Sequence, residues 1–211
     1  MNLVSVVIPT YNRNDLLFGR SLASVLRQSH HALDVHIVAD GMVDPELEIM
    51  ERRLKLLNDH RVRFWNIPRQ LYPEDPGQKW CVLGLNARNH GLNYAEGDWV
   101  SSIDDDDEWT DTHVEDLLGA AKAKGVDFAY GISQYHWPDK HYQTAGRVPL
   151  GYGALCDGSQ VYRNGMGYRY DPACISRGLP EDGDLWERMR AGGVTYTFFP
   201  QVVHHYYVNP R

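Results

Sequence analysis

The apolar positions in the first half of the chain follow two alternating patterns. Leu3 to Pro9 and Asp34 to Ala39 are nearly continuous apolar runs, as expected of strands that are covered on both faces. Between these runs, residues 15–28 carry leucine and valine at spacings of three and four, which predicts a helix. This alternation of buried strands with helices indicates βαβ units around a largely parallel sheet, and therefore an α/β fold.

Periodicity predicts further elements of the same kind up to residue 124, namely helices at residues 47–57, 81–95 and 112–124, and strands at residues 62–67 and 98–103. Pro45 suits the first turn of the helix that follows it. Thr112 and Glu115 have the spacing of a capping box at the start of the last of these helices. Residues 68–79 contain three prolines and one glycine, which predicts a loop.

The second half of the chain changes character between about residues 135 and 170. Helical spacing is absent, glycine is frequent, and large aromatic residues accumulate: Tyr135, Trp137, Tyr142, Tyr152, Tyr162, Tyr168 and Tyr170. This pattern predicts irregular loops and short antiparallel strands, in which the aromatic side chains either pack in the core or form a groove for sugar rings. A helix at about residues 181–191 and a closing strand at about residues 195–203 are expected to follow.

The composition is that of one globular domain without a membrane segment. The 211 residues are 43% hydrophobic and 11% aromatic, and no stretch approaches the roughly 20 apolar residues that a bilayer requires. The amino terminus lacks the features of a signal peptide, and Cys81, Cys156 and Cys174 form no metal-ligand pattern, so we expect reduced packing cysteines in a cytoplasmic protein. The net charge of −7 argues against general binding of nucleic acid or of an anionic membrane.

Four consecutive aspartates, Asp104 to Asp107, follow the predicted strand at residues 98–103. In open α/β sheets, ligands bind at the carboxyl ends of the strands. Neighbouring carboxylates repel each other, and a hard divalent ion, Mg²⁺ or Mn²⁺, would compensate this charge and also accept oxygens from a diphosphate. The alternative is an exposed acidic turn that favours the positive end of the helix after it.

Several segments of the chain resemble the family 2 glycosyltransferases. The most specific are VSVVIPTYNR at residues 4–13, ARNHGL at residues 87–92 and GDWVSSIDDDDEW at residues 97–109. The resemblance implies the GT-A fold, in which a Rossmann-like nucleotide-binding half with a mostly parallel central sheet (residues 1–109) adjoins a smaller acceptor-binding half (residues 110–211) within a single domain.

On the donor side, the resemblance implies that the loop after the first strand lies beneath the nucleotide base, and the residues concerned are Pro9, Thr10, Tyr11, Asn12 and Arg13. Ala39, Asp40 and Gly41 stand where the family usually has two aspartates and a glycine. Asp40 is then expected to accept a hydrogen bond from the base, which favours uracil. Taken alone, an aspartate after a strand more often caps a turn.

The resemblance also assigns roles to Arg88 and to the aspartate run. Arg88 is expected to hold the phosphates or sugar of the donor, or the aspartate turn itself, and the alternative is a surface ion pair with Glu96 or with the acidic run. If Ile103 is the aliphatic residue before the Asp-x-Asp motif, Asp104 contacts the ribose or the metal, and Asp106 is the principal metal ligand. Because the register is ambiguous by one residue, Asp105 and Asp107 are the alternatives.

The remaining candidates lie in the carboxy-terminal half. Glu181 and Asp182 resemble the Glu-Asp motif at the start of a helix, and the resemblance makes Asp182 the general base that takes a proton from the acceptor hydroxyl. Helix capping is the plain alternative. His204 or His205 is expected to close the metal site or else to stack on the tyrosines beside it, and strand alternation allows only one of the two to face inward.

The function that these resemblances imply is inverting, Mn²⁺- or Mg²⁺-dependent transfer of a sugar from a nucleotide sugar, with UDP favoured, to a hydroxyl of a glycan, small molecule or protein. A sugar nucleotidyltransferase is one alternative, but the loop of residues 9–13 lacks the glycines that such enzymes use to bind phosphate. A binding module that has lost turnover is another, and Ala39 is the feature in its favour.

Overall fold

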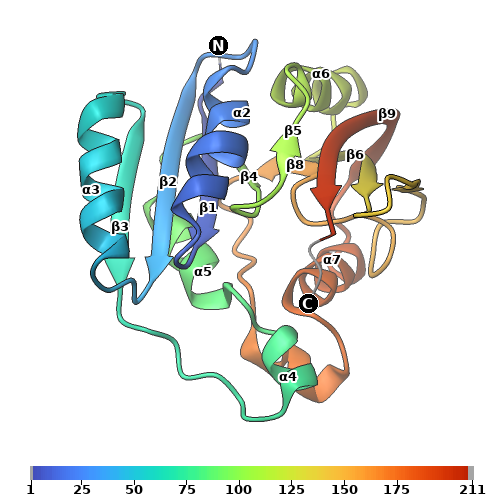
Figure 1. Cartoon of the computed structure of the whole chain (residues 1–211). Coiled ribbons are helices and arrows are strands. Elements are labelled where there is room, and N and C mark those ends of the chain that lie inside the picture. The colour runs from blue at the N-terminus through green and yellow to red at the C-terminus, as the bar shows by residue number, and fades with distance from the viewer. Residues whose placement is uncertain (1, 209–211) are drawn as a thin grey trace.

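The computed structural model describes residues 2–208, which form an α/β structure around one mixed sheet (Figure 1). The strands are β1 (Val4–Thr10), β2 (Leu33–Asp40), β3 (Val62–Ile67), β4 (Trp99–Ser102), β5 (Glu108–Trp109), β6 (Phe128–His136), β7 (Tyr142–Ala145), β8 (Gln160–Arg163) and β9 (Tyr196–Tyr207). Their order in the sheet is β3-β2-β1-β4-β8-β6-β9-β5, and β7 pairs with β6.

The helical segments are α1 (Asn14–Leu16), the π-helical turn η1 (Leu17–Ser21), α2 (Leu22–Leu26), α3 (Glu46–Leu57), α4 (Pro76–Trp80), α5 (Leu85–Tyr94), α6 (His113–Lys124), the 3₁₀ segment η2 (Pro172–Arg177) and α7 (Glu181–Ala191). The first three segments are continuous along the chain, so the helix predicted at residues 15–28 is present with one wide turn in it. The helices predicted at residues 47–57, 112–124 and 181–191 are also present.

The amino-terminal half contains the predicted parallel sheet. β1 pairs in parallel with both β2 and β4, and β2 pairs in parallel with β3. All residues of β1 and β2 are buried, because helices cover both faces of these strands. Val6 and Ile8 pack with α2 and α3 on one face, whereas Val7 packs with α5 on the other. This arrangement explains why the two strands have continuous rather than alternating apolar patterns.

The carboxy-terminal half extends the same sheet with other strand directions. β8 is antiparallel to both β4 and β6, while β9 runs parallel to β6 and is longer than predicted, since it continues to Tyr207. Some aromatic residues of this half pack in the core and others do not. Tyr162 and Tyr170 are buried in the core, whereas Tyr142 and Tyr152 are exposed.

Three local predictions are wrong at their boundaries or in their contacts. The helix predicted at residues 81–95 begins only at Leu85, because Gly84 is left-handed with φ 77°, and the predicted loop contains the short helix α4. Thr112 does not form a capping box. Its hydroxyl donates to Asp116 at 2.7 Å, and Glu115 instead accepts a hydrogen bond from Ser29 at 2.6 Å.

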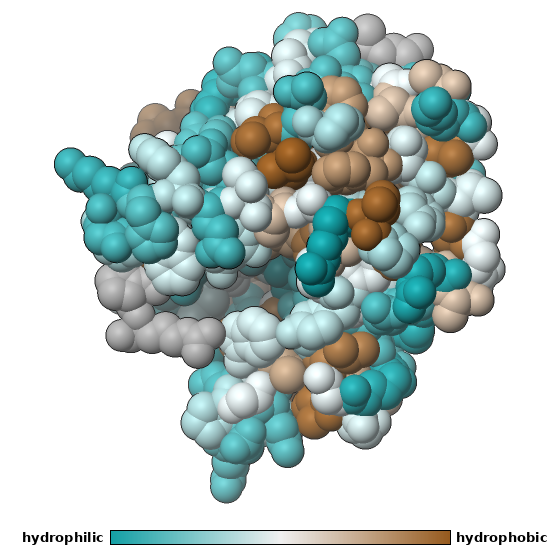
Figure 2. Space-filling model, turned by 90° about the vertical axis from the view of Figure 1, so that its right-hand side faces the viewer, coloured by the Kyte–Doolittle hydropathy of each residue, from teal (hydrophilic) through white to brown (hydrophobic). Residues whose placement is uncertain are grey.

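The surface shows no sign of a membrane-spanning element in the described part of the chain. Within residues 2–208, every helix is too short or too polar to cross the apolar core of a bilayer. Figure 2 shows apolar side chains in small separate groups among polar ones on the face that it presents.

Cys81, Cys156 and Cys174 are all free thiols, and Cys174 is buried.

Candidate active site

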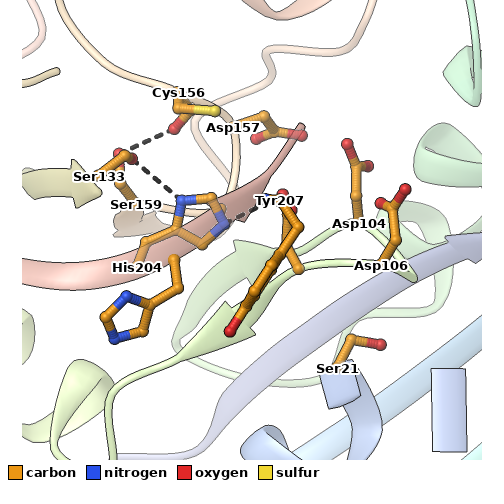
Figure 3. A network of polar contacts seen from close by, with 12 residues as sticks. Ser21, Asp104, Asp106, Ser133, Cys156, Asp157, Ser159, His204 and Tyr207 are labelled. Atoms are coloured by element: carbon orange, nitrogen blue, oxygen red, sulfur yellow. Dashed lines mark hydrogen bonds and ion pairs between the residues drawn. The ribbon is translucent and has the colours of Figure 1, made fainter. Parts of the chain in front are cut away.

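The aspartate turn lies at the carboxyl edge of the parallel strands, toward which the arrowheads of β1, β2 and β3 point in Figure 1. Asp104 to Asp107 connect β4 with β5. Asp104, Asp106 and Asp107 each offer a carboxylate oxygen, and these atoms lie within 4.8 Å of one another. Asp104 and Asp106 project in the same direction from the turn (Figure 3). This is a grouping of oxygen ligands that suits a hard divalent cation.

Asp105 is not part of this group and joins the turn to the loop after β1. Its carboxylate accepts hydrogen bonds from the Thr10 hydroxyl at 2.7 Å and from Arg13 at 3.2 Å. Burial raises the pKa of Asp105 to about 6, although the bonds from Thr10 and Arg13 oppose this shift. Arg13 also contacts Asp106 at 2.6 Å. The two segments that were predicted separately to bind the donor therefore lie against each other.

Asp107 is fully buried and faces His204. Its Oδ1 accepts the backbone N–H of Tyr207 at 3.0 Å. Its Oδ2 lies 3.2 Å from Nε2 of His204, yet the two atoms are not aligned as a hydrogen bond, and neither has another hydrogen-bond partner among residues 2–208. Burial raises the pKa of Asp107 well above its usual range and lowers that of His204 to about 4.

The neutral His204 ring contacts the Ser133 hydroxyl through Nδ1 at 3.0 Å (Figure 3). With the proton on Nδ1, a lone pair on Nε2 faces a carboxylate oxygen, and two acceptors at this distance need a proton or a cation between them. His205 turns to the other face of β9, where its Nδ1 lies 2.9 Å from Nε2 of His136. As strand alternation required, only one of the two histidines faces the aspartates.

Arg88 is 4% exposed and binds three carboxylates from separate parts of the chain. Its Nη2 contacts Asp104 at 2.5 Å, its Nε contacts Asp157 at 2.9 Å and its Nη1 contacts Glu181 at 3.2 Å. Of the expected partners, Arg88 thus contacts the aspartate turn itself. The alternative of an ion pair with Glu96 is wrong, because Glu96 accepts two hydrogen bonds from Arg63 instead, at 3.1 and 2.9 Å.

Glu181 and Asp182 begin α7, beside the Arg88 cluster. Burial raises the pKa of Glu181 well above its usual range, against the opposing effect of Arg88. Burial and the nearby charge of Asp157 raise the pKa of Asp182 to about 6. The Asp182 carboxylate accepts the backbone N–H of Gly183 at 2.6 Å. Asp182 therefore titrates close to neutral pH, as a general base requires.

Asp40 and Gly41 contact the loop that follows β3. The Asp40 carboxylate accepts hydrogen bonds from the backbone N–H of Gln70 at 2.7 Å and from the Tyr72 hydroxyl at 2.5 Å. Gly41 has φ 68°, and a Cβ atom there would lie 2.7 Å from the Cα atom of Arg69. The alternative that Asp40 organises a turn is thus observed, and a carboxylate with about four acceptor sites still has capacity for one more donor.

The remaining candidates lie at the end of β1 and in the loop after it. Pro9 and Thr10 end β1, and Tyr11 lies beneath the guanidinium of Arg69, whose Cζ is 3.6 Å from the ring centroid. Asn12 is left-handed, with φ 52°, so the chain turns sharply here before Arg13 reaches back to the aspartates.

Two further residues of the site were missed in the sequence. Asp157 contacts Arg88 but lies in no recognisable motif, and Arg20 donates to the backbone carbonyl of Asp106 at 2.5 Å. Arg20 also lies over the ring of Tyr207, 3.8 Å from its centroid. All these partners are distant in sequence, so no local spacing signalled them.

Comparison with known proteins agrees with this geometry. A model of the family described as "Glycosyl transferase family 2" matches residues 5–73 and 84–170. The glycosyl transferase WcaA of Escherichia coli K12, named for colanic acid biosynthesis, is 31% identical over 149 residues, which cover 70% of this chain and 48% of WcaA. GlyG of Streptococcus pneumoniae, named as a glycosyltransferase, is 28% identical over 129 residues, which cover 61% of this chain and 38% of GlyG.

Among solved structures, residues 1–349 of Staphylococcus aureus TarS in complex with UDP-GlcNAc superpose with a TM-score of 0.67 at 16% identity, covering 99% of this chain and 59% of that chain. The chain spans about half or less of the length of WcaA and GlyG. The family match covers well over half of the chain and the structural match nearly all of it. The chain therefore belongs to the family 2 glycosyltransferases and has their GT-A fold.

Proposed function

We propose that the chain transfers a sugar from a UDP-sugar to the hydroxyl of an acceptor, with inversion at the anomeric carbon. The observation that carries this proposal is the meeting of the aspartate turn and the start of α7 at Arg88, which contacts both Asp104 and Glu181. A donor-binding group of carboxylates and a candidate base, Asp182, thereby stand at one site. The loop of residues 9–13 lacks the glycines that a sugar nucleotidyltransferase uses to bind phosphate, which argues against that alternative.

The donor set fits a divalent metal ion. Asp104, Asp106 and Asp107 offer oxygens that lie close together. Nε2 of His204, which has no hydrogen-bond partner in the described part of the chain, faces Asp107. We expect Asp106 and Asp104 to be the main ligands of Mn²⁺ or Mg²⁺, and an imidazole ligand favours Mn²⁺. When bound, the ion supplies Lewis-acid stabilisation of the charge that grows on the departing diphosphate.

The preference for uridine rests on Asp40 and on the relatives. A uracil ring offers an N–H donor, which the remaining acceptor capacity of Asp40 can satisfy. TarS is described in complex with UDP and with UDP-GlcNAc, and the Escherichia coli relative WfaP, 25% identical over 130 residues covering 62% of this chain and 45% of WfaP, is named for a UDP-Glc donor. These relatives support a UDP-sugar but do not identify the sugar of this donor.

On the acceptor side, Asp182 is the proposed base. It removes the proton of the acceptor hydroxyl as the oxygen attacks the anomeric carbon from the face opposite the diphosphate. Tyr152, 53% exposed, packs against Gly183 next to Asp182, since a Cβ atom on Gly183 would lie 2.5 Å from the Tyr152 ring. An exposed aromatic face at this position suits the apolar face of a sugar ring. We therefore favour a glycan acceptor over a small alcohol.

The test combines binding with turnover. Thermal unfolding is measured with UDP and with UDP-sugars, with and without Mn²⁺, and release of UDP is followed with a panel of glycan acceptors. We expect UDP and Mn²⁺ together to stabilise the wild type and an Asp106→Ala variant to lose the metal-dependent part, because ligands that bind only the folded state raise its melting temperature.

An Asp182→Asn variant separates binding from catalysis. It should keep the stabilisation by UDP and Mn²⁺ but lose sugar transfer by about 10²- to 10⁴-fold, the usual contribution of a general base. Asp139→Asn, in the exposed turn before β7, is the matched control and should behave as the wild type. If the wild type binds UDP and Mn²⁺ but transfers no sugar from any donor tested, the chain is a binding module and the proposal is wrong.

A further inference from the structure

Asp157 is a buried acidic residue that belongs to none of the sequence motifs of the site. It precedes β8, is 6% exposed, and directs its Oδ2 at Nε of Arg88, at 2.9 Å. Its Oδ1 accepts hydrogen bonds from the Ser102 hydroxyl and from Nε2 of Gln160, both at 2.7 Å. Its carboxylate faces the side on which Asp104 lies (Figure 3). One oxygen of Asp157 thus binds the guanidinium of Arg88, and the other anchors the carboxylate to Ser102 and Gln160.

The partners of Asp157 tie it to the rigid centre of the sheet. Ser102 ends β4, Gln160 begins β8, and these two strands pair directly. The Ser102 hydroxyl also receives a hydrogen bond from Nε2 of Gln160 at 3.0 Å, which closes a buried triangle of polar groups. These three mutual hydrogen bonds, made between buried side chains on two paired strands, hold the Asp157 carboxylate in one arrangement.

A fixed Nε determines where the rest of the guanidinium points, because the group is planar and its N–H directions are rigid. Nη2 then reaches Asp104, and Nη1 reaches both Glu181 and the carbonyl of Leu83, the latter at 2.8 Å. Together with Asp157, these contacts use four of the five N–H groups that arginine has. A buried Arg88 with one uncommitted N–H is better placed to orient carboxylates than to bind a phosphate.

We propose that Asp157 is a positioning residue for sugar transfer. It holds Arg88 in the orientation that fixes Asp104 of the aspartate turn and Glu181 of α7 at a set distance from each other. Because Asp182 follows Glu181, the same contact sets the distance between the base and the donor. This inference rests on the proposed function. Asp157 itself touches neither the donor nor the acceptor.

The first test compares two substitutions of Asp157. Asp157→Ala removes the contact with Nε, and we expect kcat to fall by about tenfold to 100-fold with less than about threefold change in the KM for the donor, since small displacements of catalytic groups cost up to about 100-fold in rate. Asp157→Asn has the same shape. Its amide oxygen can face Nε of Arg88 if the side-chain amide of Gln160 turns over, because Oε1 of Gln160, which has no partner among residues 2–208, then takes the place of Nε2 and accepts from the new NH₂. We expect Asp157→Asn to retain kcat within about fivefold of the wild type.

Asp34→Ala is the matched control for folding. Asp34 is also 6% exposed and accepts a hydrogen bond from a buried serine, Ser5, at 2.9 Å, but it lies at the opposite end of the parallel strands. We expect Asp34→Ala and Asp157→Ala to lower the melting temperature alike, while only Asp157→Ala lowers kcat. Equal kcat values for these two variants would overturn the proposal, as would an Asp157→Asn variant that is folded but as slow as Asp157→Ala.

A double-mutant cycle with Arg88→Lys tests whether Asp157 acts through Arg88. Lysine keeps the charge but lacks the planar fork, so Asp157→Ala should cost at most about threefold in this background. A full loss there would show that Asp157 acts by another route. If the wild type has no transferase activity, the proposed function is wrong and kcat cannot be compared. The position of Asp104 is then tested by measuring the affinity of each variant for Mn²⁺ alone. Equal Mn²⁺ affinity of Asp157→Ala and wild type would overturn the positioning role independently.

Discussion

The pH dependence of transfer provides a direct measure of Asp182. Burial and the charge of Asp157 raise the pKa of this carboxyl to about 6, whereas Arg88 and the backbone N–H of Gly183 oppose the shift. A base works only when it is deprotonated. With a pKa of about 6 in the folded protein, about 90% of the molecules are active at pH 7 and about 10% at pH 5, whereas an ordinary aspartate of pKa about 3.9 would still be about 90% deprotonated at pH 5.

We therefore expect kcat/KM for the acceptor to fall about ninefold to tenfold between pH 7 and pH 5, with its midpoint near 6. The assay uses saturating donor and Mn²⁺, so that the aspartates of the turn are already engaged and their own titration does not contribute. Asp182→Asn should abolish this acid limb and leave a low rate that does not depend on pH in this range. A wild-type midpoint at or below about 4.5 would refute the assignment of Asp182 as a buried base.

Three further predictions concern the metal and the fold. In a calorimetric titration with Mn²⁺, His204→Gln should weaken binding by about tenfold or more. In the same titration His205→Gln, on the other face of β9, should change the affinity by less than about twofold. Gly41→Ala should lower the free energy of unfolding by more than about 1 kcal/mol in urea titrations, because alanine is strained at φ 68° and its Cβ would meet the Arg69 backbone; a neutral effect would contradict this contact. Burial raises the pKa of Asp104 to about 8, so this carboxyl holds its proton in the folded chain to a higher pH than in the unfolded chain, and its own contribution to the stability of the metal-free protein falls as pH rises toward 8. Mn²⁺ should therefore raise the melting temperature more at pH 8 than at pH 6, and equal increases would argue against Asp104 as a ligand.

The elements and the edge of the sheet that carries the site were predictable from local patterns. Continuous apolar runs identified β1 and β2, because each residue of these strands faces one of two helical layers. The aspartate run follows β4, so the sequence also placed it at the carboxyl edge where the loops meet. The capping box predicted at Thr112 does not form, because the Thr112 hydroxyl donates to Asp116 and Glu115 accepts from Ser29 instead.

The sequence by itself determined which residue types stand at the end of which strand, and alternation along β9 already required that one histidine face inward. Only the tertiary structure decided that this is His204, that Asp105 turns to Thr10, and that Arg88 joins Asp157 and Glu181, which lie 69 and 93 residues away along the chain. The physical reason is that periodicity records the burial of each residue within its own element. The partner of a buried charge depends on how elements distant in sequence pack together, and a buried charge must find such a partner wherever the fold places it.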